Sequence, residues 1–226
     1  MLVMRFSFLP EKRVDFPGGM ENIRGMKIDL HVHTTLSSCS QLTLEQILNN
    51  AQAKGLDGVC ITDHDTMAVA DSLQEGIQEN GLCVLFGMEY ATKGGDFLLF
   101  GPFETLPVGL PAETVLAAVD AAGGVAIAAH PCRPGRSTNV SLLKKGLCRI
   151  IEGVNGRNAA YDNQTVALWP KYYQIGAVGG SDAHTLAELG QVPTQFNVPI
   201  WSRDDLIFAL KEGRYNSLTC ASPYPE

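Results

Sequence analysis

Histidines and acids gather at the ends of short apolar runs in this sequence. All five histidines lie at or directly after the carboxyl end of such a run, and they are His31, His33, His64, His130 and His184. Glu89 closes another apolar run, and Asp182 stands two residues before His184. Because the carboxyl ends of strands form the ligand-binding face of α/β barrels and open α/β sheets, we expect these side chains to converge.

The types and spacing of these residues point to metal binding. His31 and His33 are two apart on an extended chain, so their side chains point to the same side, and Asp182 and His184 repeat this spacing. The two oxygens of Glu89 could bridge two ions. A mixture of imidazole and carboxylate donors is typical of Zn²⁺, Mn²⁺ or Fe²⁺ rather than Ca²⁺. One such histidine alone would more often be an ordinary hydrogen-bonded side chain, but the joint pattern predicts a metal site.

Strand-like and helix-like segments alternate from Lys27 onward and must position these groups. We expect strands at the apolar runs 28–30, 59–61, 82–86, 97–100, 125–129, 150–154 and 175–178. We expect helices at 44–51, where Thr43 is the N-cap and Gln46 stands three residues later, and at 66–79, 111–122, 158–172 and 203–212. This alternation predicts an α/β sheet or barrel with strands buried on both faces.

Composition limits the class of protein. The chain has 226 residues, of which 45% are hydrophobic, and its 17 Lys and Arg against 24 Asp and Glu leave a net charge of −7. These values suit one barrel-sized globular domain and exclude a mainly disordered chain. An acidic chain lacks the overall field needed to hold a nucleic-acid backbone without sequence preference.

Several features predict the setting of the protein. No apolar run approaches the roughly 20 residues that span a bilayer, and the N-terminus does not resemble a secretory signal. The six cysteines contain no C-x-x-C pair, so we expect a reduced, cytoplasmic protein. Residues 1–25 lack clear periodicity, which predicts an N-terminal appendage or a natural start at Met20 or Met26.

The segments D-L-H-V-H-T, I-T-D-H-D-T, G-M-E, A-H-P and G-S-D-A-H together resemble the four-motif signature of the PHP (polymerase and histidinol phosphatase) family. The resemblance covers residues 27 to about 215. It implies a single domain over residues 26–226, folded as a distorted seven-stranded (β/α)7 TIM-like barrel with two or three divalent metal ions at its C-terminal face. The resemblance places metal-ligand roles on His31, His33, His64, Glu89, His130, Asp182 and His184.

Two positions depart from the family pattern. Many members carry a further histidine shortly after the glutamate, where this chain has Asp96. A Gly94–Gly95 hairpin turn would bring Asp96 beside Glu89, so we expect Asp96 to be a substitute ligand rather than an ordinary turn aspartate. Members also often place an Asp or His five or six residues after the H-x-H motif, as a ligand to a third metal. Here Ser38 and Cys39 stand at these positions, and a thiolate ligand or an inert loop thiol both remain open, as does a two-metal centre.

The substrate side of the site is predicted to be basic. Arg133 and Arg136 follow His130, and Asn155 and Arg157 follow the 150–154 run. Arginine is suited to bidentate contact with phosphate oxygens, so we expect these residues to bind substrate, although solvated loop arginines are the alternative.

Our leading hypothesis is a metal-dependent phosphoesterase that acts on a small phosphorylated metabolite or nucleotide. The ions would lower the pKa of a bridging water and supply hydroxide, while the arginines would neutralise charge on the phosphoryl group. Asp182 would share the proton of the nucleophile, and His64 or His184 would protonate the leaving oxygen.

Three alternatives remain open. An amidohydrolase-like C–N hydrolase would usually need a carbamylated lysine, and no lysine ends a central strand. A nuclease-type PHP domain is disfavoured by the acidic charge balance. A non-catalytic metal-binding module is the third. The expected partner is therefore a small phosphorylated substrate, with no membrane and no nucleic acid beyond nucleotides, and the oligomeric state is open.

Overall fold

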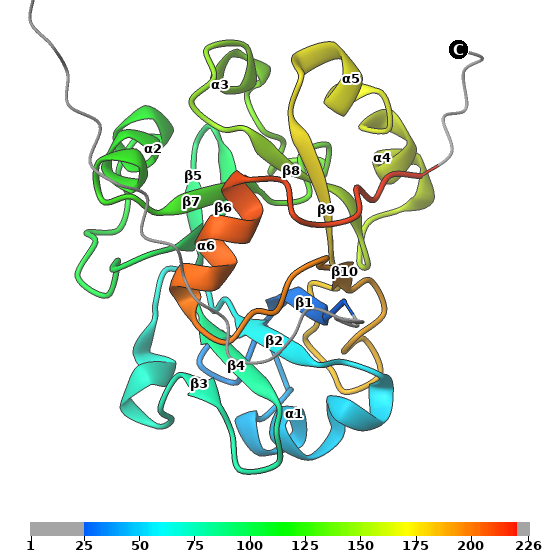
Figure 1. Ribbon diagram of the computed structural model, residues 1–226. Coiled ribbons are helices and arrows are strands. Elements are labelled where there is room, and N and C mark those ends of the chain that lie inside the picture. The colour runs from blue at the N-terminus through cyan, green and yellow to red at the C-terminus, as the bar shows by residue number, and fades with distance from the viewer. Residues whose placement is uncertain (1–24, 221–226) are drawn as a thin grey trace, which may run out of the picture.

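Two five-stranded sheets form the framework of the computed structural model, which describes residues 25–220 (Figure 1). The first has the strand order β10-β1-β2-β4-β3, with bounds Thr194–Gln195, Lys27–Val32, Gly58–Ile61, Cys83–Phe86 and Gly76–Ile77. The second has the order β5-β6-β7-β8-β9, with bounds Met88–Thr92, Gly95–Phe100, Val125–Ala128, Ile150–Asn155 and Gly176–Gly180. The predicted appendage at residues 1–25 lies almost wholly outside the described residues.

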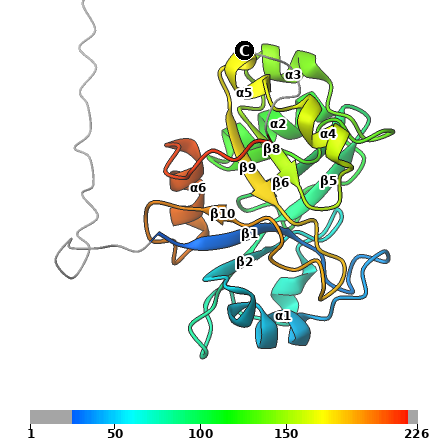
Figure 2. The ribbon, with the colours of Figure 1, turned by 90° about the vertical axis from the view of Figure 1, so that its right-hand side faces the viewer.

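Six α-helices surround the sheets within the described residues. They are α1 (Leu44–Asn50), α2 (Ala112–Ala121), α3 (Val140–Lys144), α4 (Ala160–Thr165), α5 (Trp169–Tyr173) and α6 (Arg203–Lys211). In Figure 1 the first sheet and α1 make up the lower half of the molecule, and the second sheet with α2 to α5 makes up the upper half. Figure 2 shows β1 running along the boundary between the two halves. None of the helices among residues 25–220 is long and apolar enough to cross a bilayer.

The closed seven-stranded barrel that the family resemblance implied is not observed. All seven predicted apolar runs do form strands, and β1, β2 and β4 are parallel to one another, as are β7, β8 and β9. However, β5 follows β4 after the single residue Gly87, too short a connection for a parallel crossover, and it pairs with β6 as an antiparallel hairpin. Within the described residues, the β-bridges between the two sheets are isolated ones, Val32 with Ala183 and His64 with Glu89.

The helix predictions hold at three of five positions. Thr43 caps α1 through a reciprocal capping box with Gln46, and the predicted helices at 111–122 and 203–212 are α2 and α6. The helix predicted at 66–79 is wrong: a 3-10 turn (Ala68–Asp71) is followed by β3, which pairs with β4. The helix predicted at 158–172 is divided into α4 and α5, because Pro170 is accommodated only in the first turn of a helix.

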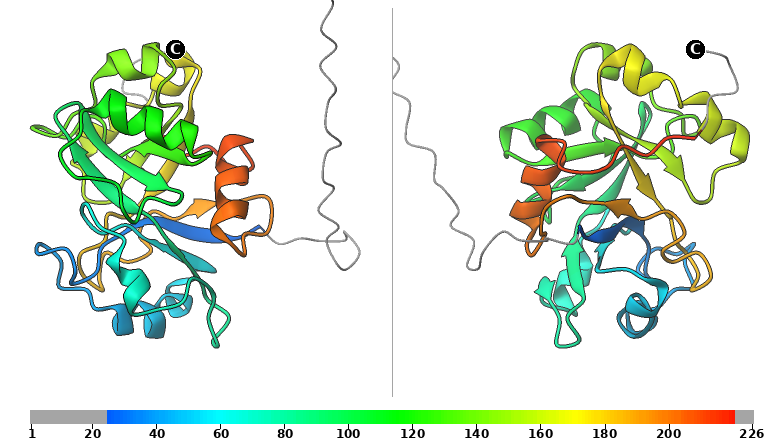
Figure 3. Two further views of the ribbon diagram at one scale, coloured as in Figure 1. Left: turned by 90° about the vertical axis from the view of Figure 1, so that its left-hand side faces the viewer. Right: turned by 45° about the vertical axis from the view of Figure 1, so that its right-hand side comes forward.

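A shared apolar core joins the two sheets to α6. Leu206, Ala209 and Leu210 of the helix are buried in one cluster with Ile28 of β1 and Leu98 of β6. Figure 3 shows α6 standing at the side of the molecule beside both halves. Burial of each leucine side chain contributes about 1.5–3 kcal/mol to stability, so this helix holds the sheets in a fixed relation.

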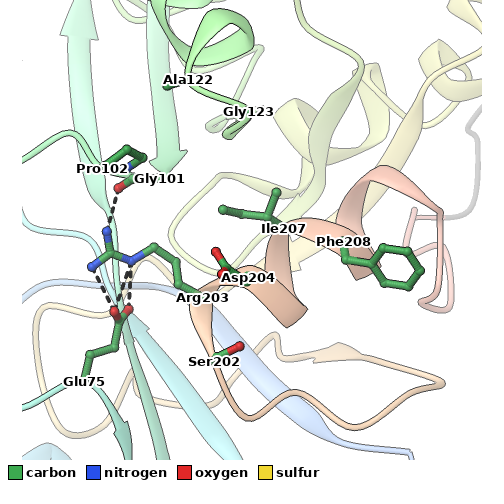
Figure 4. A pocket seen from close by; sticks show the side chains of 10 residues that line it. All are labelled: Glu75, Gly101, Pro102, Ala122, Gly123, Ser202, Arg203, Asp204, Ile207 and Phe208. Atoms are coloured by element: carbon green, nitrogen blue, oxygen red, sulfur yellow. Dashed lines mark hydrogen bonds and ion pairs between the residues drawn. The ribbon is translucent and has the colours of Figure 1, made fainter. Parts of the chain in front are cut away.

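Arg203 attaches the first turn of α6 to both sheets. Its guanidinium donates to both carboxylate oxygens of Glu75 at 2.9–3.1 Å and to the Gly101 carbonyl at 2.7 Å (Figure 4). A second carboxylate, Glu104, lies 3.1 Å away. No histidine lines the adjoining cavity of about 580 Å³, and the Arg203 guanidinium in it is already hydrogen-bonded to these acceptors. We therefore interpret the contacts of Arg203 as structural and the cavity as no metal site.

Replacement of this arginine should weaken the fold without removing a metal ligand. We expect Arg203→Met to lower the free energy of unfolding by about 1–3 kcal/mol, because a partly buried Glu75 carboxylate then loses its charged donor. Denaturant unfolding measures the change, with the exposed Arg214→Met as the matched control. Equal stability of the two variants would contradict this role.

Candidate metal centre

The five histidines meet where the two sheets meet. The ring of His33 lies 4.9 Å from that of His31, 4.5 Å from that of His64 and 4.3 Å from that of His184, between ring centroids. The ring of His130 lies 5.9 Å from that of His31. Four of the side chains are buried, whereas 29% of the His64 side chain is exposed. The predicted convergence of the histidines is therefore confirmed.

Glu89 lies at the middle of the histidine cluster. Its Oε2 atom lies 3.0 Å from His64 Nδ1, 3.2 Å from His33 Nε2 and 3.3 Å from His31 Nε2. Its Oε1 atom lies 2.6 Å from His130 Nε2. One carboxylate thus touches four imidazoles, as expected for a group that bridges adjacent cations.

Two aspartates flank this carboxylate. Asp182 places Oδ1 at 3.4–3.5 Å from the Nε2 atoms of His31 and His33. Asp96 comes from the predicted hairpin, in which Asp96 pairs with Ala91, and its Oδ2 lies 4.0 Å from His130 Nε2. The structure therefore brings Asp96 to the cluster as predicted.

Three groups of side chains in this cluster offer donor atoms close enough together to hold an ion. They are His33, His64 and His184; His31, His33, Glu89 and Asp182; and Glu89, Asp96 and His130. Glu89 Oε2 is buried and has no hydrogen-bond partner, although three imidazole nitrogens surround it. A divalent cation would satisfy such an oxygen, and the donors are those that Zn²⁺, Mn²⁺ and Fe²⁺ prefer, so the residues fit a metal cluster.

Hydrogen bonds made by Nδ1 of His33 and His184 determine which nitrogen of each ring carries the hydrogen. Ser37 Oγ donates to Asp63 at 2.5 Å, so it can only accept from His33 Nδ1, 3.2 Å away. His184 Nδ1 donates to the Asp182 carbonyl at 2.8 Å. In the neutral form of either ring Nε2 then carries the lone pair, and this is the form that ligates metal.

Charge and burial shift the ionisation of the cluster strongly. Burial alone would lower the pKa of His31, but the negative charges of Glu152, Asp182 and Glu89 outweigh it and raise the pKa well above its usual value. Burial would raise the pKa of Glu89 and of Asp182, but the positive charge of His31 holds both below their usual range. Without metal, the cluster is therefore a network of carboxylates and protonated imidazole.

The pKa of His184 shifts in the opposite direction to that of His31. Burial and the charge of His33 lower the pKa of His184 to about 4. Its Nε2 atom lies 3.2 Å from the thiol of Cys39, an exposed residue, while Ser38 is exposed beside it. Of these two positions, Cys39 is therefore the one that lies beside a predicted metal ligand.

Two residues of the cluster, and the residue that follows His64, have unusual backbone conformations. Asp65, His130 and Asp182 have φ angles of 53°, 30° and 54°, and only one other non-glycine residue among residues 25–220 has a positive φ. Such conformations cost about 1–3 kcal/mol each and persist only where the surroundings enforce them. Their concentration here indicates that the fold gives up stability to aim these side chains.

Sequence reasoning missed several supporting acids. Asp63 accepts hydrogen bonds from Thr34 and Ser37, and Asp29 accepts from the backbone of Ser181 and Gly190. Glu152 contacts His31 at 2.8 Å. Asp29 and Asp63 stand inside the quoted motifs, so their position was visible, but only the fold shows which donors they meet.

The four predicted substrate-binding residues lie at the same site, and each contacts different partners. Arg133 Nη2 pairs with Asp182 at 2.7 Å and Arg136 Nη1 pairs with Asp96 at 2.8 Å. Arg157 is partly exposed and lies 3.4 Å from Glu188. Asn155 is buried, and its amide is committed to Arg133 and Glu152, so it supports the site rather than facing solvent.

Comparison with known proteins agrees with this geometry. The PHP domain family model matches residues 29–173, and a PHP-associated model matches residues 160–215. The chain belongs to the PHP domain family. The family that the motifs predicted is therefore confirmed.

Individual relatives cover much of this PHP domain. The uncharacterized protein MJ1587 of Methanocaldococcus jannaschii is 34% identical over 119 residues, which cover 48% of this chain and 70% of that protein. PsfC from Pseudomonas syringae superposes with a TM-score of 0.69 at 23% identity, covering 88% of this chain and 93% of that one. The lesion-specific endonuclease Q from Pyrococcus furiosus gives 0.64 at 18% identity, covering 83% and 57%. At these identities, the two superpositions show a shared fold.

Divalent-ion binding should tighten with rising pH and should release protons. His31 has a raised pKa, so in the metal-free protein its ring keeps a proton to higher pH than a free imidazole, and an ion must displace it. Glu89 and Asp182, whose pKa values are lowered, carry no proton to release near neutral pH.

Calorimetric titration with Zn²⁺ or Mn²⁺ between about pH 6 and 8, in buffers of different ionisation enthalpy, counts these protons. A binding enthalpy that is independent of the buffer, with an affinity that is flat over this range, would contradict the charge network described above.

Proposed function

We propose that this PHP domain hydrolyses the phosphoester of a small phosphorylated metabolite or nucleotide. The observation that carries the proposal is the contact of two arginines with carboxylates of the metal-binding groups, Arg133 with Asp182 and Arg136 with Asp96. Guanidinium groups beside the expected cations form a receptor for a doubly charged phosphate. Bound cations there would lower the pKa of water and polarise the phosphoryl oxygens.

The metal-holding roles follow the donor groups. His31, His33 and Asp182 would hold one ion, Asp96 and His130 a second, and Glu89 would contact both. A third would lie among His33, His64 and His184. Two or three ions, drawn from Zn²⁺, Mn²⁺ and Fe²⁺, are compatible with these donors.

Arg133 is already held in place for a phosphate. Its Nε donates to Asn158 and its Nη2 to Asn155, at 3.0 and 2.8 Å. These two neutral acceptors hold the side chain beside Asp182, which pairs with the same Nη2 at 2.7 Å, and 23% of the side chain is exposed. Arg133 would therefore neutralise charge that develops on the phosphoryl group with little reorganisation.

The solvent exposure of each histidine decides which of them we assign as proton donor. His184 Nδ1 donates to the Asp182 carbonyl, its Nε2 lies beside the Cys39 thiol, and the side chain is 5% exposed. His64 is the histidine of the cluster with open access to solvent. In a two-metal centre it would hold no ion, and for that case we assign protonation of the leaving oxygen to His64. Asp182 would share the proton of the attacking water.

The rim of the site favours a compact, charged substrate. The side chains of Arg136 and Arg157 are 49% and 40% exposed, and both can turn toward a second anionic group. The net charge of −7 over the whole chain disfavours a long polyanion.

A nuclease is the second candidate, because the fold superposes on that of endonuclease Q over 83% of this chain. The same metal groups could cut a phosphodiester. The two candidates differ in whether the substrate extends beyond the arginine rim.

One activity panel separates the candidates. Metal-stripped protein is reloaded with Mn²⁺ or Zn²⁺ and assayed on sugar phosphates, nucleoside monophosphates, single-stranded oligonucleotides, duplex DNA with an abasic site, and simple amides. We expect turnover of the small phosphoesters, lost with chelator and restored by metal. Turnover of oligonucleotides or amides alone would overturn the proposal, as would full activity in chelator after confirmed metal loss.

Arg133 should matter for the reaction. We expect Arg133→Ala to lower kcat/KM on the order of 100-fold, because one preorganised cationic donor is lost from the phosphoryl group. Arg149→Ala, an arginine at the start of β8 on the opposite end of the strands, is the control. Equal kcat/KM for both variants would contradict a role of Arg133 in the reaction.

A further inference from the structure

We propose that Glu152 is the positioning residue that fixes His31 as a metal ligand through Nε2 and that links this ligand to Arg133. The inference rests on the proposed function of the same site. Glu152 is absent from the three donor groups, so its role is to act through the residues it contacts.

Glu152 is surrounded by hydrogen-bond donors. The side chain is fully buried, and its Oε1 accepts from His31 Nδ1 at 2.8 Å. Its Oε2 accepts from the backbone N–H of His130 at 2.7 Å and from Asn155 Nδ2 at 2.8 Å. One carboxylate therefore contacts His31 on β1, the backbone of His130 after β7, and the side chain of Asn155, which in turn contacts Arg133.

The local backbone explains how Glu152 reaches these partners. The pairing of β8 with β9 shifts by one residue between Glu152 and Val154. Such a bulge interrupts the alternation of side chains, so that Glu152 and Asn155, three residues apart, face the same site. On the neighbouring strand, Gly180 leaves the space that the carboxylate fills, because a Cβ atom there would collide with Glu152 Oε1.

The three contacts require an acceptor at both oxygens. Two of the partners, the His130 N–H and the Asn155 amide, are donors whatever the ionisation state of the protein. Asn155 is oriented independently, because its Oδ1 accepts from Arg133 Nη2 and from the Arg157 N–H. With Oε2 accepting from both of these groups, Oε1 accepts from His31 Nδ1–H, which leaves the Nε2 lone pair free for metal.

A glutamine at this position would offer one acceptor and one donor in nearly the same shape. If its amide N–H group faces His31, the ring must move its proton to Nε2 and lose its ligand lone pair. If that group faces His130 and Asn155 instead, donors meet donors and the support of Arg133 is lost.

The test compares zinc binding and the tautomer of His31 in the wild type, Glu152→Gln, and Glu104→Gln. Glu104 is an exposed partner of Arg203 and serves as the control. Zinc affinity is measured by competition with a chromophoric chelator. The ring nitrogen that carries hydrogen is assigned by ¹⁵N-edited NMR of the zinc-loaded proteins, and a dispersed amide spectrum confirms that each variant is folded.

We expect Glu152→Gln to bind zinc about 10- to 100-fold more weakly than the wild type, whereas Glu104→Gln is unchanged. In the zinc-loaded wild type, we expect His31 to carry hydrogen on Nδ1. Ligation of His31 through Nδ1 in the wild type would overturn the inference, even if Glu152→Gln failed to fold. Unchanged zinc affinity in folded Glu152→Gln would also overturn it. Absence of zinc binding by the wild type would instead be a failure of the proposed function.

Discussion

The structure depends on the placement of six buried carboxylates around one set of imidazoles. Within the described residues, Asp29, Asp63, Glu89, Asp96, Glu152 and Asp182 are the acidic residues with buried side chains, and each contacts the histidine-bearing segments or their arginines. A buried carboxylate is costly unless positive charge and hydrogen bonds compensate it. Arg133 and Arg136 compensate two of the six. Backbone and hydroxyl donors compensate Asp29 and Asp63, so bound cations, or protonated imidazole in their absence, would balance the charge of Glu89 and Glu152.

The fold meets this constraint by joining two sheets at the site. The isolated bridges of Val32 with Ala183 and of His64 with Glu89 bring the ends of both sheets together. The hairpin of β5 and β6 supplies Glu89 and Asp96, and the bulge in β8 supplies Glu152 and Asn155. Positive φ angles at His130 and Asp182 aim two further groups. The irregular features of the fold therefore coincide with the chemical groups, while α6 and the apolar core stabilise the regular remainder.

Much of this site could be predicted because its ligands follow apolar runs and stand at short, regular spacings. The seven runs became strands, and Asp96 reached Glu89 through its Gly94–Gly95 turn. The absence of a closed barrel could not be predicted from the sequence. The β5–β6 hairpin that interrupts the barrel begins one glycine after β4, and nothing in the sequence distinguishes its strands from other apolar runs. The short strand β3 was missed because its pairing with β4 is non-local. Glu152 was missed because its role depends on a bulge and on the space left by Gly180, neither of which has a periodic signal.

The central claim is that Glu89 lies between adjacent cations. Anomalous diffraction from crystals grown with Mn²⁺ or Zn²⁺ tests it most directly, because it locates each ion relative to each side chain. We predict at least two ions flanking the Glu89 carboxylate, with imidazole nitrogens at about 2.0–2.1 Å from zinc. Ions found only on the surface, or none within coordination distance of Glu89 and His31 at saturating metal, would contradict this account.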